Sequence, residues 1–185
     1  MAGINRALLN RSQKKIYESK IESKNEKPCV FISHRSSDMK AAEAIAKYLK
    51  SNDIDIYLDK LDGELQEKAK EEDAKGIVEA INEGLKYSTH ILVLISDRTR
   101  ESWWVPYEVG YSKKGEKKIA SALLMGYVEG FPDYLKIEKT IKSPEEFETY
   151  AKDIRFESLR DGFLAEYVIE SVSKPIGLEK YIRRV

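Results

Sequence analysis

A chain of 185 residues can bury one full hydrophobic core, and the usual size of roughly 100–200 residues per domain gives no reason to expect two domains. Its 32 basic residues balance its 32 acidic residues, so no global field favours binding to nucleic acid or to an anionic membrane. The segment Met1–Arg11 lacks an apolar signal core, and no later run reaches the roughly 18–20 apolar residues of a membrane span. The single cysteine, Cys29, cannot form an intrachain disulfide. We therefore expect a cytosolic protein.

Four short apolar runs are bounded by polar or turn residues and largely lack a polar–apolar alternation. This pattern is typical of strands that are buried on both faces in a parallel sheet. Between the runs, apolar residues recur at spacings of three and four, which predicts helices with one face on the sheet. The repeated strand–helix order predicts a doubly wound, flavodoxin-like α/β sheet. The predicted strands are Cys29–Ser33, Ile54–Leu58, His90–Ser96 and Ile119–Met125.

The predicted helices carry their apolar stripes before the second, third and fourth strands and after the last one. In the last helix, Ser143 stands at the cap, Pro144 in the first turn and Glu146 at the third position, which is the usual pattern of a helix start. The stripes are Ala41, Ala44, Ile45, Tyr48 and Leu49; Ile77, Val78, Ile81 and Leu85; Trp104 to Tyr111; and Phe147, Tyr150, Ala151 and Ile154.

The segments that flank this pattern are less regular. We expect a central domain over residues 28–156, with helical extensions over 1–27 and 157–185 that either pack on the domain or mediate self-association. A weak stripe of Ile4, Leu8 and Ile16 marks the first extension, and Phe163, Leu164, Tyr167, Val168 and Val172 predict a helix in the second. The charged segment Asp59–Asp73 is expected to be a mobile loop over one end of the sheet.

Ligands of an open parallel sheet bind outside the carboxyl ends of the strands, because loops and helix N-termini converge there. The first predicted strand leads into Ser33–Asp38, the second ends at Asp59, and the third leads into Ser96–Arg98. The helix that follows presents Trp104 and Glu108 four residues apart, on one face. This mixture of hydroxyls, cations, an aromatic ring and carboxylates suits a ligand with phosphate and ribose groups.

A metal site is not expected. The two histidines, His34 and His90, are far apart in the sequence, and His90 begins a buried strand.

Five segments, in this order along the chain, resemble successive motifs of a bacterial TIR (Toll/interleukin-1 receptor) domain. The resemblance runs from about Pro28 to about Ile154, and its specificity lies in the ordered set, since a Trp-x-x-x-Glu pair alone is common. In size and architecture the chain resembles the TIR subunit of Thoeris-type antiphage systems. The five segments are Phe31–Asp38, Ile54–Asp59, Ile77–Gly84, Ile91–Ser96 and Ser102–Glu108.

The resemblance implies a TIR fold and an enzyme that cleaves NAD, as a substrate and not a cofactor, between nicotinamide and ribose. Glu108, as the glutamate of the Trp-x-x-x-Glu motif, would be the catalytic residue. Because the leaving nicotinamide is already cationic in NAD, no general acid is needed to protonate it, so one carboxylate can suffice, unlike the pair that ordinary glycosidases use. Glu108 would stabilise the positive charge of an oxocarbenium-like state. The product is either ADP-ribose or a cyclic isomer that signals to an effector protein, and the sequence does not choose between them.

The other site residues follow from their positions beside this glutamate. Asp38 has two interpretations of equal weight, ligand contact or a cap on the following helix. Trp104 is expected to pack in the core whatever else it does, whereas Trp103 must point elsewhere and can be exposed. Ser33, His34 and Arg35 would meet the diphosphate or a nearby ribose, Asp59 would lie at the pocket edge, and Trp104 would form a wall.

Three other functions deserve comparison. A TIR scaffold that only self-associates has no need for Glu108. A receiver-like domain needs acidic residues after the first strand, where Ser33 and His34 stand instead, so we reject it. A nucleoside deoxyribosyltransferase also uses a glutamate at a sugar carbon, but the Ser33–Asp38 loop fits a TIR domain better. Since many TIR enzymes act only when assembled, self-association is expected as well.

Overall fold

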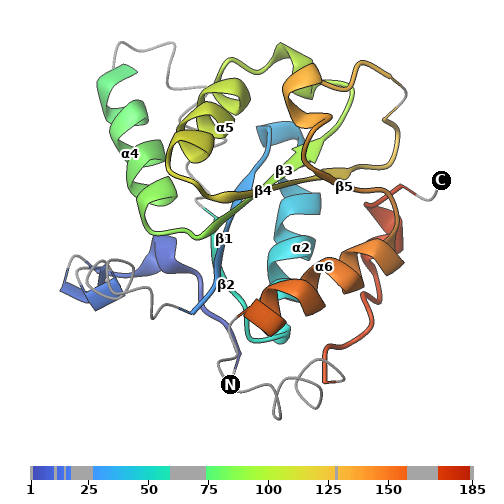
Figure 1. Cartoon of the computed structure of the whole chain (residues 1–185), viewed down its shortest axis with the longest axis horizontal. Helices are drawn as coiled ribbons and strands as arrows, with labels where there is room; N and C mark the ends of the chain where they lie inside the picture. Colours follow the sequence, from blue (N-terminus) through green and yellow to red (C-terminus); the bar gives the residue numbers. More distant parts are fainter. Residues whose placement is uncertain are drawn as a thin grey trace.

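The computed structural model describes residues 2–10, 12–14, 16–17, 27–58, 74–127, 129–157 and 171–183. Five strands form one parallel sheet in the order β2-β1-β3-β4-β5 (Figure 1). This is the strand order of flavodoxin-like folds, so the predicted fold class is confirmed. The strands are β1 (Cys29–Ser33), β2 (Asp55–Tyr57), β3 (His90–Ile95), β4 (Lys118–Leu123) and β5 (Lys139–Ile141).

Helices cover both faces of the sheet (Figure 1). One face carries α2 (Met39–Ser51) and α6 (Pro144–Glu157), and the other carries α4 (Ala74–Lys86) and α5 (Trp104–Lys114). Short 3₁₀ turns are η1 (Arg6–Leu8), η2 (Ser36–Asp38), η3 (Thr99–Glu101), η4 (Asp133–Leu135) and η5 (Leu178–Lys180). All four helices appear where the apolar stripes predict them. No helix in these described ranges is both long enough and apolar enough to cross a membrane.

The two faces of the sheet follow from the alternation of side chains along each strand. In β1, Val30 and Ile32 point into the core under α2 and α6, whereas Cys29 and Phe31 point into the core under α4 and α5. Ser33 continues the second set, so its hydroxyl lies on the face that α5 covers. The register of one strand therefore decides which helix can meet this serine.

The strand β5 is absent from the sequence-based prediction. It has only three residues, and only Ile141 is buried, so it does not form an apolar run. It pairs with β4 through Ala120, Ser121 and Ala122. The predicted loop 59–73 and the predicted helix around 163–172 lie outside the described residues, apart from Val172, which is buried.

Segments near both ends of the described chain are fastened to the sheet. Ile4, Leu8 and Ile16, the weak stripe of the first extension, are exposed, and Arg6 is buried instead, with 1 % of its surface accessible. Its guanidinium pairs with Asp55 at 3.1 Å. The Arg6 side chain also donates to the carbonyls of Tyr87 (2.9 Å) and Lys27 (2.7 Å). At the other end, buried Ile182 forms an antiparallel bridge with Leu124.

The glycine Gly84 allows α4 to approach the sheet closely. A Cβ atom added there would lie 2.5 Å from Tyr57 and 2.7 Å from Phe31, whose rings stack in the core. Gly84→Ala should therefore lower the free energy of unfolding by about 1–3 kcal/mol through overpacking. Gly110→Ala is the control, because it adds a methyl group to α5 with no atom within 4 Å and should raise stability by about 0.5–1 kcal/mol. Urea unfolding measures both, and a change of the same sign in both variants would contradict the packing.

Candidate functional site

The predicted ligand-binding edge lies at the carboxyl ends of β1 and β3. These neighbouring strands are the point where the strand order reverses, since β1 leads to β2 on one side and β3 leads to β4 on the other. In sheets of this class the crevice at that point is the usual binding site. The loop that follows β1 holds Ser33–Asp38, and the loop that follows β3 holds Ser96–Ser102.

Helix α5 turns Glu108 toward the protein interior. Its buried residues are Val105, Glu108, Val109 and Ser112, which stand three or four positions apart on one face. Glu108 is 4 % exposed, so a carboxylate occupies a position where the stripe would ordinarily place an apolar side chain. Burying a carboxylate is costly unless hydrogen bonds compensate, so its partners are part of the site.

The hydroxyl of Ser33 donates a hydrogen bond to Oε2 of Glu108. Ser33 is itself only 1 % exposed, so this bond lies away from water and is charge-assisted. It joins the end of β1 to the middle of α5 across 75 positions of sequence. The structure thus brings together two of the predicted site residues, and it fixes the orientation of the carboxylate.

His34 follows directly and is also buried. Its Nδ1 lies 3.0 Å from the carbonyl oxygen of Ile32, which can only accept, so Nδ1 carries the proton in the neutral ring. Nε2 is then an acceptor, and among the described residues it has no hydrogen-bond partner. Burial lowers the pKa of His34 below its ordinary value of 6.5 because it disfavours the imidazolium.

Arg35 and Asp38 link the loop after β1 to the loop after β3. Arg35 Nη1 donates to the carbonyl of Arg98 (2.6 Å) and to Oε2 of Glu101 (2.9 Å). Oδ2 of Asp38 accepts a hydrogen bond from Ser96 Oγ at 2.8 Å. Asp38 stands at the N-cap position of α2 but makes no side-chain cap hydrogen bond, so the capping interpretation is wrong. These contacts link the two loops to each other.

The two tryptophans have separate environments. Trp104 is partly buried against the core under α4 and α5, and its ring meets that of Tyr107 edge-to-face at 6.3 Å. Trp103 is 90 % exposed, as the sequence predicts. The predicted pocket-edge residue Asp59 lies outside the described residues.

Tyr134 is a residue of this edge that the sequence analysis does not identify. Burial raises the pKa of its phenol, and the negative charge of Glu108 raises it further, so the ring lies within electrostatic reach of that carboxylate. A single tyrosine in a short turn belongs to no motif or periodic pattern by which the sequence could identify it. A cavity of about 320 Å³ is lined by Leu123, Tyr127, Phe131, Lys136, Thr140 and Lys142.

A protein-family model described as Thoeris protein ThsB, TIR-like domain, matches residues 31–126, which is just over half of the chain. The chain belongs to this family of TIR-like domains. It is therefore a defence-related TIR protein, and the resemblance seen in the motifs is confirmed. The matched range contains both Ser33 and Glu108, but not Tyr134. A search of curated proteins finds no match to the chain.

The buried imidazole gives a prediction about pH. With its pKa below 6.5 in the folded protein, His34 takes up a proton more readily in the unfolded chain, so stability is lost as the pH falls below 6.5. Between pH 7 and pH 5.5 the wild type should lose more stability than His34→Gln. Urea unfolding at both values measures the difference, and an equal loss in the two proteins would refute the assignment.

Proposed function

We propose that this TIR protein cleaves NAD between nicotinamide and ribose, with Glu108 as the catalytic carboxylate. The observation that carries the proposal is the buried Glu108 side chain, which Ser33 holds at the point where the strand order reverses. A helix that only covers a sheet is more stable with an apolar side chain at this position. The family supports the proposal, because its members are TIR-like domains.

The reaction needs no proton donor for its leaving group. The bond from the ribose C1′ to the nicotinamide nitrogen breaks with both electrons passing to nitrogen, so the cationic ring leaves as neutral nicotinamide. Positive charge develops on the ribose, where a carboxylate held in a site without water stabilises it strongly. Water then attacks C1′ and releases a proton, or a group of the ADP-ribose attacks and closes a ring. Glu108 supplies the negative charge, and the hydrogen bond from Ser33 fixes the orientation of its carboxylate.

The neighbouring side chains suit the rest of such a substrate. His34 Nε2 would accept a hydrogen bond from a ribose hydroxyl. Arg35 would bind the diphosphate through the N–H groups of its guanidinium other than those of Nη1, which contact Arg98 and Glu101. Tyr134 offers a ring within electrostatic reach of the carboxylate, and Trp104, one turn before Glu108 on α5, would form a wall. Asp59 stays a prediction at the edge of this site.

The product would serve as a signal in defence. Either ADP-ribose or a cyclic isomer leaves the site, and an effector protein that binds the product would carry the response. A cytosolic location, expected from the sequence, would give the protein direct access to NAD. The alternative is a TIR scaffold without catalysis, and the exposed Trp103 together with the linked loops is the observation that favours it.

Substitution of Glu108 separates these two functions. Glu108→Gln keeps the size of the side chain but removes its charge, so nicotinamide release should fall by at least about 100-fold. Concentrated protein is incubated with NAD, and the products are resolved by chromatography with mass detection, which also distinguishes ADP-ribose from a cyclic isomer. Glu116→Gln, an exposed change just beyond the end of α5, is the control and should retain the wild-type rate.

Equal release by wild type and Glu108→Gln would show that another group performs the reaction. If neither protein releases nicotinamide, even in extracts of infected cells, the scaffold function replaces the enzyme.

Self-association gives a second test. If neighbouring copies complete the site, turnover per protomer should rise as the protein is concentrated, because the active form is an assembly. Initial rates of nicotinamide release across a dilution series measure this, with light scattering on the same samples to record the size of the particle. A turnover per protomer that does not change with concentration would contradict the proposal.

A further inference from the structure

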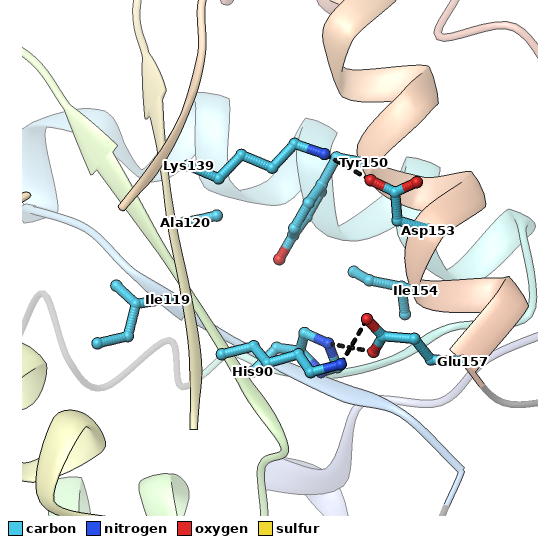
Figure 2. A pocket seen from close by; sticks show the side chains of 9 residues that line it. His90, Ile119, Ala120, Lys139, Tyr150, Asp153, Ile154 and Glu157 are labelled. Atoms are coloured by element: carbon cyan, nitrogen blue, oxygen red, sulfur yellow. Dashed lines mark hydrogen bonds and ion pairs between the residues drawn. The ribbon is translucent and has the colours of Figure 1, made fainter. Parts of the chain in front are cut away.

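A second cavity lies at the opposite edge of the sheet from Glu108, between the N-terminal ends of β3, β4 and β5 and the helix α6 (Figure 2). Its volume is about 200 Å³. The first residue of β5 pairs with Ala120, so β5 begins two positions after β4 and does not extend beside Lys118 and Ile119. The helix α6 bridges this gap in the sheet edge without filling it. We refer to the space between Ala120, Tyr150 and Ile154 as the α6 cavity.

The walls of the α6 cavity are mostly apolar. Ala120 comes from β4, Ile154 from α6, and the ring of Tyr150 forms a further side, whereas the side chain of Ile119 points to the other face of the sheet (Figure 2). The volume lies below the roughly 300–1,000 Å³ of sites for drug-sized molecules. These walls therefore suit a small, flat, apolar ring system.

The hydroxyl of Tyr150 points into this space, between His90, Ala120 and Ile154 (Figure 2). Tyr150 is 5 % exposed, and among the described residues its oxygen has no hydrogen-bond partner. Burial raises the pKa of this phenol well above its ordinary value of 10, so it stays a donor at neutral pH. A buried polar group without a partner is uncommon and costs stability. A ligand in the cavity that accepts a hydrogen bond from this hydroxyl would remove that cost.

The charged groups at the rim neutralise one another. Lys118 Nζ lies 2.5 Å from Oε1 of Glu157, and His90 Nε2 lies 3.1 Å from Oε2 of the same carboxylate. Lys139 Nζ lies 2.5 Å from Oδ2 of Asp153. Since each lysine already faces a carboxylate, the rim has little excess charge with which to hold an ion. Its lysines and carboxylates still offer both donors and acceptors to a polar group.

We propose that the α6 cavity is a binding site for a small, uncharged heteroaromatic molecule that accepts a hydrogen bond from Tyr150. The class includes the nucleobases and nicotinamide. The flat ring would lie against Ala120 and Ile154, and its acceptor would meet the phenol. The site is separate from Glu108 and does not depend on the proposed NAD cleavage.

Benzamide tests the proposal as a probe, because it is flat and uncharged and carries a carbonyl acceptor. The full chain is titrated and followed by two-dimensional NMR, with saturable shifts expected around Ala120, Tyr150 and Ile154. Tyr150→Phe removes the hydroxyl that would donate to the carbonyl of benzamide, so binding should weaken about tenfold. Benzoate has the same ring with a charge and should bind at least about tenfold more weakly, since the rim offers no excess positive charge.

Stability measurements on two tyrosine variants accompany the titration. Tyr150→Phe deletes an unpaired hydroxyl and should leave the unfolding midpoint unchanged or raise it. Tyr48→Phe is the matched control, because the hydroxyl of Tyr48 lies in the same core but donates to the carbonyl of Ser173 at 2.8 Å. Tyr48→Phe should lower the midpoint and leave the affinity for benzamide unchanged. Ala120→Val, which fills the cavity, should abolish binding.

Four results of the titrations would overturn the proposal. These are the absence of saturable shifts up to the solubility limit of benzamide, equal affinity in Tyr150→Phe and wild type, equal affinity for benzoate and benzamide, and shifts confined to residues around Glu108. A lower midpoint in Tyr150→Phe, matching that of Tyr48→Phe, would also overturn it, because the hydroxyl would then be satisfied by an internal water.

Discussion

The hydrogen bond from Ser33 to Glu108 is the constraint on which the site depends. A carboxylate that is 4 % exposed on the core-facing side of α5 is unfavourable unless a donor meets it inside the protein. Ser33 supplies a donor from the face of β1 that α5 covers, which the alternation along β1 assigns to Cys29, Phe31 and Ser33. The sheet register, the packing of α5 and the orientation of the carboxylate therefore depend on one another.

The loops around this carboxylate are held by their own contacts. Arg35 is bound to Glu101 and to the carbonyl of Arg98, and Asp38 is bound to Ser96. Among the described residues, these contacts of Arg35 use only Nη1, so the other N–H groups of its guanidinium can donate to a phosphate while the loops stay linked.

The sequence predicts those features that repeat along the chain. Four strands are continuous apolar runs and four helices carry periodic stripes, whereas β5 has three residues and one buried side chain, too few to form a pattern. Trp104 and Glu108 are identified by their spacing in an ordered set of motifs. Arg6 and Tyr134 are not, because their positions depend on single tertiary contacts, an ion pair with Asp55 and proximity to Glu108. No periodicity or spacing encodes contacts of that kind.

The most direct test of the proposed role of Glu108 is a crystal structure of the Glu108→Gln variant with NAD. The account predicts intact NAD at the carboxyl ends of β1 and β3, with the nicotinamide ribose within hydrogen-bond reach of the side chain at position 108. It also predicts that the guanidinium of Arg35 donates to the diphosphate. NAD bound elsewhere, such as in the α6 cavity, or with its ribose remote from position 108, would contradict the account.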